Sequence, residues 1–276
     1  MAKTIKLILS DIDGTILDNN HQVDAHLRDT ITELKKESIP FVLASARSPH
    51  GMFPIAQELN LGANPIACYN GALIVEGNKE HYQTLIEHGL SKADVKKIVA
   101  LIKKQFPHIS INFYSGGDWI VEEIDQWVQI EANITKESPD IRNFDTLLTD
   151  DSIPIPIHKL LLIANAQAIQ EFFTYLKRVN FEDASFYLSK DNYLEVTSQS
   201  VSKENALLEI AKYYDISLSQ TMAIGDNYND IPMLKLAGLG VAMANAPQAV
   251  KNEADIETVS NNDNGVSKVI EDYVLI

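Results

Sequence analysis

The chain has 276 residues, of which 45% are hydrophobic and 22% are charged, so it can bury one large α/β core or two smaller ones. Its formal net charge is −15, from 23 basic and 38 acidic residues. This charge argues against broad binding of nucleic acids or anionic membranes, which require a basic surface. A small anionic substrate remains compatible, because a local cluster of cations can outweigh distant negative charge.

The single cysteine, Cys68, lies in an apolar run, so no intrachain disulfide can form and a buried thiol is expected. The first ten residues lack the apolar core and cleavage site of a signal peptide, and no apolar run is long enough to span a bilayer. We therefore expect a cytoplasmic protein that binds neither membranes nor nucleic acids. The sequence does not indicate its oligomeric state.

Short apolar runs that end at polar or small residues predict buried parallel strands, and amphipathic segments between them predict crossover helices. In the first part of the chain, strands are expected at 5–9, 41–44 and 66–69. Helices are expected between them, at 25–37 and 48–59. After residue 190, a helix is expected at 203–214, a strand at 222–224, a helix at 231–237 and a strand at 241–243. This alternation predicts an α/β domain with a parallel sheet.

Residues 84–189 have a different pattern, which indicates an α+β block of antiparallel character. The expected elements are a helix at 91–106 capped by Ser91, strands at 109–114, 119–123 and 159–163, a helix at 166–178 and a last strand at 185–188. We interpret the pair His158-Lys159 as strand surface. The pattern predicts an inserted α+β domain at 84–189, with 1–83 and 190–276 forming the first domain.

Polar clusters follow three of the predicted parallel strands. They are Asp11-Ile12-Asp13-Gly14-Thr15, Ser45-Ala46-Arg47 and Gly225-Asp226-Asn227. Ligands bind open parallel sheets at the carboxyl ends of the strands, so these clusters should converge on one site.

Asp11 and Asp13 are two residues apart at the end of an extended segment, so their side chains should point the same way. Two such carboxylates are unfavourable unless a cation lies between them or one is protonated. A solvated turn is the alternative, because Asp-Gly is a common turn dipeptide. Asp226 and Asp230 offer the oxygen ligands that Mg²⁺ prefers, although acidic residues here can also cap a helix.

Ser45 can donate a hydrogen bond to a phosphate oxygen, although a helix cap is the better explanation of this residue taken alone. Lys203 begins a predicted helix, where the helix dipole disfavours a cation unless an anion must be neutralised. Together these residues suit phosphoryl transfer. One carboxylate attacks phosphorus and a second protonates the leaving oxygen, while Mg²⁺, Lys203 and Ser45 stabilise the charge on the phosphoryl oxygens.

With these motifs, the sequence resembles the haloacid dehalogenase (HAD) superfamily, and specifically its Cof-like hydrolase and sugar-phosphatase branch. The family's four motifs match in order at Asp11–Thr15, Ser45, Lys203 and Gly225–Asp230. The resemblance covers nearly the whole chain. It implies a Rossmann-like parallel sheet core with an inserted α+β cap domain that selects the substrate.

The resemblance implies that Asp11 is the nucleophile and Asp13 the general acid and base. It also implies a Mg²⁺ ion held by the Asp11 side chain, the Asp13 backbone carbonyl and Asp226, with Asp230 supporting the water shell of the metal.

Ser45, Lys203 and Asn229 would hold the transferring phosphoryl group, as the resemblance implies. Arg47 is a further candidate for substrate contact. The expected function is therefore hydrolysis of a small phosphorylated metabolite, such as a sugar phosphate, through an aspartyl-phosphate intermediate.

Two alternatives remain open. A phosphomutase would use the same two aspartates but would need basic groups in the cap for a second phosphate, and Arg142 and Arg178 are isolated in the sequence. A non-catalytic regulatory protein on the same fold is disfavoured by the four intact motifs.

Overall fold

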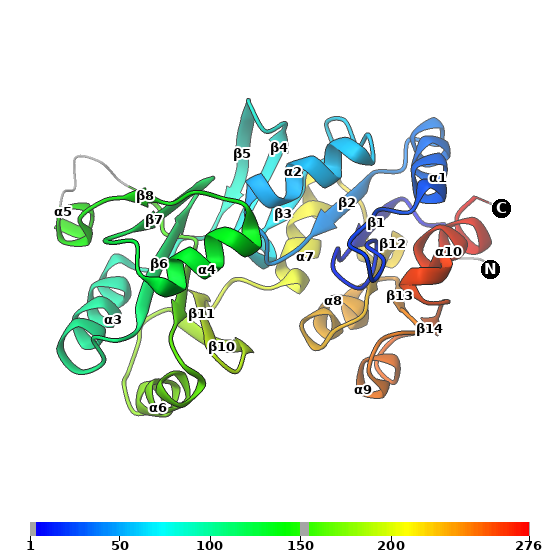
Figure 1. Cartoon of the computed structure of the whole chain (residues 1–276). Coiled ribbons are helices and arrows are strands. Elements are labelled where there is room, and N and C mark those ends of the chain that lie inside the picture. Colours follow the sequence, from blue (N-terminus) through cyan, green and yellow to red (C-terminus); the bar gives the residue numbers. More distant parts are fainter. Residues whose placement is uncertain (1–3, 150–154, 276) are drawn as a thin grey trace. The chain divides into compact units, whose positions relative to one another are not determined.

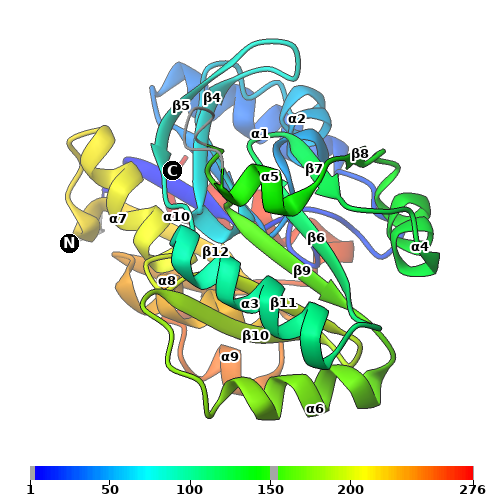
Figure 2. The same cartoon turned by 90° about the vertical axis from the view of Figure 1, so that its left-hand side faces the viewer.

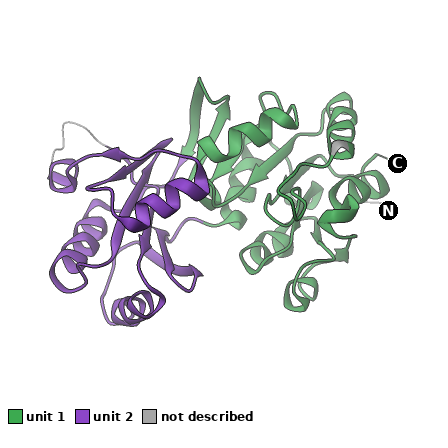
Figure 3. Ribbon diagram, in the orientation of Figure 1, with its two compact units in different colours: residues 1–86, 202–276 green, residues 87–201 purple. Residues whose placement is uncertain are grey.

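The computed structural model describes residues 4–149 and 155–275, which form two compact units (Figure 3). The first unit comprises residues 1–86 and 202–276, and the second comprises 87–201. Along the chain, the second unit is therefore inserted into the first. Within the described ranges, no helix is both long enough and apolar enough to cross a membrane.

A sheet with the strand order β14-β13-β12-β1-β2-β3-β4-β5 forms the centre of the first unit (Figure 1). Pairing is parallel from β14 to β3, and β4 is antiparallel to β3. The strands are β1 (Leu7–Ser10), β2 (Phe41–Ala44), β3 (Ile66–Cys68), β4 (Leu73–Gly77), β5 (Tyr82–Glu87), β12 (Thr221–Gly225), β13 (Leu239–Ala242) and β14 (Ile256–Glu257). This architecture confirms the predicted α/β class.

The helices of this unit connect the strands and bury their apolar faces. They are α1 (Ala25–Lys36), α2 (Pro49–Glu58), α7 (Lys203–Tyr213), α8 (Ile231–Leu236), α9 (Gln248–Lys251) and α10 (Gly265–Tyr273). Alternate residues of β1 and β2, such as Leu7, Leu9 and Val42, share one buried cluster with α7, α8 and α9. Each fully buried aliphatic side chain contributes roughly 1.5–3 kcal/mol, so the sheet is a rigid support for its strand ends.

The second unit contains a sheet with the order β10-β11-β9-β6-β7-β8, and α3 and α6 cover one of its faces (Figure 2). The expected antiparallel character is confirmed for β10 with β11, β11 with β9, β9 with β6 and β6 with β7. Its elements are α3 (Lys92–Gln105), β6 (Ser110–Ser115), β7 (Asp118–Val121), α4 (Gln126–Thr135), β8 (Asp140–Ile141), α5 (Phe144–Thr149), β9 (Lys159–Ile163), α6 (Ala166–Leu176), β10 (Ala184–Lys190) and β11 (Tyr193–Ser198).

The second unit ends at residue 201, whereas the sequence placed the end of the insertion at 189. The difference arises from β11, which pairs with both β9 and β10 and therefore belongs to this sheet. Local patterning did not reveal β11 as part of the insertion, because membership of a sheet depends on partners distant in sequence.

The interpretation of His158 and Lys159 as strand surface is wrong, since they are only 1% and 8% exposed. His158 Nδ1 accepts a hydrogen bond from the Gly116 N–H at 2.9 Å. Lys159 Nζ lies 3.5 Å from a Glu195 carboxylate oxygen. Because β9 lies between two other strands, its residues are buried even where they are polar.

Candidate active site

The three polar clusters follow strands that are neighbours in the sheet, in the order β12-β1-β2. Asp11 comes directly after β1, Ser45 after β2 and Asp226 after β12. The Asp11 N–H donates to the Ile224 carbonyl at 2.9 Å, which continues the hydrogen bonding between β1 and β12 by one residue. This hydrogen bond fixes the backbone position of Asp11. The predicted convergence of these clusters therefore follows from parallel pairing of adjacent strands.

Three carboxylates meet at this edge of the sheet. Asp11, Asp226 and Asp230 each offer an oxygen, and these oxygens all lie within 4.8 Å of one another. Lys203, the first residue of α7, is 2% exposed and donates to both Asp11 and Asp230, the latter at 2.6 Å. The Ser202 hydroxyl caps α7 by accepting the Asn205 N–H. The start of α7 thus places an ammonium group between two buried carboxylates.

The cluster carries more negative charge than Lys203 alone neutralises. Burial raises the pKa of Asp11 to about 8, and repulsion from Asp230 and Asp226 adds to this against the attraction of Lys203. Burial and Asp230 likewise raise the pKa of Asp226 to about 6. Burial disfavours the charge of Lys203, but Asp11 and Asp230 outweigh burial and raise its pKa. A bound cation would relieve this repulsion and favour ionised carboxylates.

The donor set fits Mg²⁺, which prefers carboxylate and carbonyl oxygens. The Thr15 hydroxyl donates to Asp226 Oδ1 at 3.0 Å and so orients this carboxylate. Gly14 has φ +81°, and a Cβ atom there would lie 2.4 Å from Asp226 Oδ2. Glycine therefore lets the loop after β1 pass directly against Asp226. The sequence missed the role of the Thr15 hydroxyl, although this residue stands in the first motif.

Asp230 also organises the loop that carries Asp226. Its Oδ2 accepts the backbone N–H groups of Asp226 at 3.0 Å and Asn227 at 2.9 Å, while its Oδ1 accepts from Lys203. Asn229 lies exposed in the 3₁₀ turn Tyr228–Asp230. Asp230 therefore holds the backbone of the fourth motif, Gly225–Asp230, through hydrogen bonds inside the motif itself.

The Asp13 carboxylate lies apart from the acidic cluster and pairs with Arg47. Arg47 donates from Nε at 2.9 Å and from Nη2 at 2.5 Å to the two oxygens of Asp13. This two-point contact fixes the orientation of the guanidinium group relative to the carboxylate. The Asp13 side chain is 47% exposed, which leaves it accessible to substrate and water. The backbone N–H of Arg47 donates to Ser45 Oγ at 3.3 Å. The sequence named Asp13, Ser45 and Arg47 as candidates but could not show that Arg47 holds Asp13.

Comparison with known proteins agrees with this arrangement of motifs. Residues 8–270 match the family model for haloacid dehalogenase-like hydrolases. The chain belongs to this family. A protein of Haemophilus influenzae is 33% identical over 269 residues, which are 97% of each chain.

Other relatives of this haloacid dehalogenase-like hydrolase also match over nearly their full length. The 5-amino-6-(5-phospho-D-ribitylamino)uracil phosphatase YcsE of Bacillus subtilis is 28% identical over 276 residues, covering 98% of this chain and 96% of the relative. The crystal structure of a haloacid dehalogenase-like hydrolase from Bacteroides thetaiotaomicron has a TM-score of 0.84 at 31% identity, covering 98% of this chain and 99% of that one. These matches confirm the predicted family and the predicted fold.

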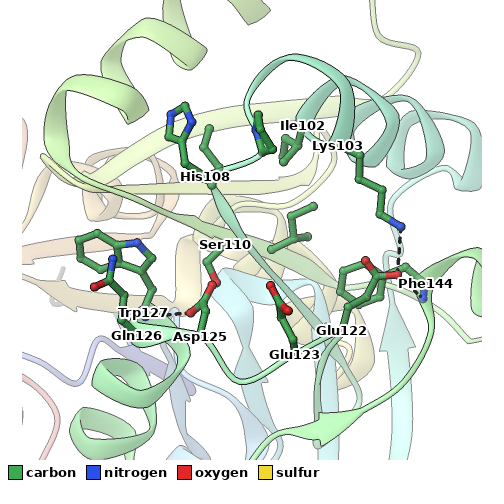
Figure 4. Close-up of a pocket in the computed structure, with 13 residues that line it drawn as sticks. Ile102, Lys103, His108, Ser110, Glu122, Glu123, Asp125, Gln126, Trp127 and Phe144 are labelled. Atoms are coloured by element: carbon green, nitrogen blue, oxygen red, sulfur yellow. Dashed lines mark hydrogen bonds and ion pairs between the residues drawn. The ribbon is translucent and has the colours of Figure 1, made fainter.

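The second unit of this hydrolase contains a cavity of about 450 Å³ between α3, β6 and the start of α4 (Figure 4). On its rim, Lys103 donates to Glu122 at 3.0 Å, and Glu122 also accepts the Phe144 N–H at 3.1 Å. None of the site residues predicted from the sequence lines this cavity. The candidate active site is therefore the acidic cluster and not this cavity.

The raised pKa values predict a pH dependence of stability in the hydrolase without metal. Asp226, with a pKa of about 6 when folded against 3.8 normally, retains its proton in the folded state while the unfolded chain loses it. Stability should thus fall as pH rises from about 4 through 6, by on the order of 2 kcal/mol for this group. Thermal unfolding in EDTA at pH 5 and pH 8 measures the change.

Mg²⁺ should oppose this loss, raising the melting temperature more at pH 8 than at pH 5, because ionised carboxylates bind the cation. Asp226→Asn provides the control, since it should reduce the pH dependence and leave the part that comes from the raised pKa of Asp11. An unchanged slope in that variant would show that other groups cause the effect.

Proposed function

We propose that the protein is a Mg²⁺-dependent phosphatase that hydrolyses a small phosphorylated metabolite through an aspartyl-phosphate on Asp11. The observation that carries the proposal is the buried contact of Asp11 with Lys203, beside Asp226 and Asp230, where adjacent parallel strands end. Acid and base chemistry would come from Asp13, which stands two residues from the nucleophile on an accessible loop.

In the first step, a carboxylate oxygen of Asp11 forms a bond to phosphorus as the bond from phosphorus to the ester oxygen breaks. Asp13 gives its proton to the departing alcohol. In the second step, Asp13 takes a proton from water, which attacks the phosphorus and releases Asp11 and inorganic phosphate. Mg²⁺, held by Asp11, the Asp13 backbone carbonyl and Asp226 with support from Asp230, would supply stabilisation of negative charge.

The phosphoryl oxygens would be held by Lys203, Ser45 and Asn229. Lys203 is already directed at Asp11 and is the nearest fixed cation to the reacting carboxylate. Arg47 is positioned to contact a substrate anion as well as Asp13, since its side chain is 33% exposed. Such preoriented donors lower the barrier because they need not reorganise during the reaction.

A small phosphate monoester is the substrate class that we propose, with sugar and polyol phosphates first among the candidates. The Bacillus subtilis relative named above is a phosphatase of a phosphorylated ribityl compound, which supports this class. The second unit would act as the cap that selects among such esters. A screen of phosphorylated metabolites with Mg²⁺ tests the proposal. Release of phosphate from none of them would contradict it.

A phosphomutase is less well supported. Such an enzyme needs unpaired cations in its cap for a second phosphate, whereas Arg142 is engaged by Asp140 at 2.7 Å and Asp118 at 3.3 Å. A non-catalytic role is also less well supported, because burying charged groups such as Lys203 and Asp11 is unfavourable and a non-catalytic protein would not need them.

Removal of Mg²⁺ should reduce hydrolysis of an activated aryl phosphate by about 100-fold or more, because the cluster then keeps protons on its carboxylates. EDTA followed by excess Mg²⁺ should restore the rate. Asp226→Asn should abolish the rise in melting temperature that Mg²⁺ produces, without destabilising the metal-free protein, since Asp226 is repelled there. Full activity in excess chelator would contradict the metal assignment.

Asp13→Asn should impair hydrolysis of alkyl phosphates more than that of activated aryl phosphates. An alkoxide needs a proton in order to leave, whereas a nitrophenolate does not. The expected difference is about 10- to 100-fold in kcat, and phosphate should accumulate on Asp11 because its hydrolysis lacks a base. Steady-state rates with both ester types give the measurement. Equal losses for the two would refute the role of Asp13.

A further inference from the structure

Two asparagines outside the predicted site hold the loop that carries Asp13. Asn245, which follows β13, donates from Nδ2 to the backbone carbonyl of Gly14 at 2.8 Å. Asn261, which follows β14, donates from Nδ2 to the carbonyl of Leu17 at 2.9 Å. Since β13 and β14 lie on the far side of β12 from β1, these contacts reach the loop from the opposite end of the chain.

The two asparagines are coupled to each other. The backbone N–H of Asn261 donates to Asn245 Oδ1 at 3.1 Å. This contact directs the oxygen of the Asn245 amide to Asn261 and its nitrogen to Gly14. Asn261 is only 7% exposed, and its Nδ2 also reaches Asn19 Oδ1 at 3.4 Å. A buried amide holds such contacts firmly, because losing them leaves a desolvated donor.

The held loop is short and turns sharply. The N–H groups of Thr15, Ile16 and Leu17 all donate to the Ile12 carbonyl, so the chain turns back immediately after Asp13. Gly14 lies in the turn with φ +81° and has no Cβ to restrict its backbone. The hydrogen bond from Asn245 therefore adds a restraint at the glycine, beside the contacts of Thr15 with Asp226 and of Arg47 with Asp13.

We propose that Asn245 and Asn261 are positioning residues that hold the loop and thereby aim the Asp13 carboxylate. The proposal rests on the function proposed above, in which Asp13 is the general acid and base. Both asparagines donate to backbone carbonyls of the loop, at Gly14 and Leu17, and so act on Asp13 through the backbone. Displacement of a proton donor by about 1 Å can lower a rate by about 100-fold.

Asn245→Asp tests the contact with almost no change of shape. The aspartate keeps an oxygen for the Asn261 N–H but presents a second oxygen to the Gly14 carbonyl in place of a donor. Asn245→Ala removes the contact without adding charge. Asn252→Asp is the matched control, because Asn252 is exposed in the same unit and its Oδ1 accepts only from Gln248 Nε2 at 2.9 Å among the described residues.

Both Asn245 variants should lower kcat for an alkyl phosphate by about 10- to 100-fold. The loss should be clearly smaller for an activated aryl phosphate, with KM and melting temperature close to those of the wild type. Asn252→Asp should change neither rate. A merely structural role would lower both rates together, along with the melting temperature, so an equal loss for the two esters would overturn the proposal, as would no loss.

Hydrogen exchange provides a readout that does not require activity. Amides at 13–17 should exchange faster in Asn245→Asp, Asn245→Ala and Asn261→Asp than in the wild type and Asn252→Asp. If the wild type hydrolyses neither ester, the proposed function fails, and the exchange data alone then decide whether the asparagines hold the loop. Unchanged exchange in the Asn245 and Asn261 variants would overturn the inference whatever the activity.

Discussion

Asp11→Asn is expected to reduce phosphatase turnover by on the order of 10⁴-fold or more, because an amide cannot form the aspartyl-phosphate. The variant should remain folded. Burial and two neighbouring carboxylates already disfavour the charge of Asp11, raising its pKa to about 8, so a neutral residue of the same shape is tolerated there. A large loss of rate with an intact fold would assign Asp11 to the chemistry and not to the core.

Rapid-quench labelling with a radiolabelled substrate, followed by peptide mapping, provides the direct measurement. Label should appear on Asp11 in the wild type and on no residue in Asp11→Asn. Asp29→Asn, at an exposed position on α1, provides the control and should retain both label and turnover. Label on another residue of the wild type would refute the proposed intermediate.

Lys203→Met is expected to affect both stability and turnover. Lys203 lies fully buried between Asp11 and Asp230, so its removal leaves two buried carboxylates without their cation. Breaking a buried ion pair in this way costs about 3–5 kcal/mol. Turnover should fall by about 10²- to 10³-fold as well, because the donor nearest the transferring phosphoryl group is lost.

The effect on stability should depend on pH in a defined direction. Because Asp11 and Asp230 raise the pKa of Lys203, the folded state keeps its ammonium charged at and below neutral pH, where its stabilising contribution is fully present. In the variant, the lowering effect of Lys203 on the pKa of Asp11 is lost, so this pKa rises further and Asp11 takes up a proton as pH falls, which relieves the repulsion. The loss of stability should therefore be larger at pH 8 than at pH 5.

Denaturant unfolding in EDTA at the two pH values measures this difference. Lys212→Met on the same helix is the matched control, since Lys212 is exposed in the last turn of α7. A loss no greater than that of the control would refute the role of Lys203 as the buried counter-ion. A loss of the same size at both pH values would show that missing packing, and not charge, destabilises the variant.

Much of the fold was predictable because its determinants are local. An apolar run such as Phe41–Ala44 is too short for a helix, and the polar residue that ends it marks the edge of the sheet. The cap of α3 was likewise readable, since the Ser91 hydroxyl accepts the Asp94 N–H three residues later. Elements with weaker local signals were missed, among them α4 and β11, because burial against distant partners decides their state.

The sequence by itself determined the fold class and the family, and strand ends and motif spacing placed the candidate residues Asp11, Ser45 and Asp226 at neighbouring positions. Only the tertiary structure decided how these groups are paired. Arg47 holds Asp13 across 34 residues of chain, and Lys203 reaches Asp11 across 192. No local pattern encodes such contacts, because they depend on which strands become neighbours and on the side chains that this packing excludes from water.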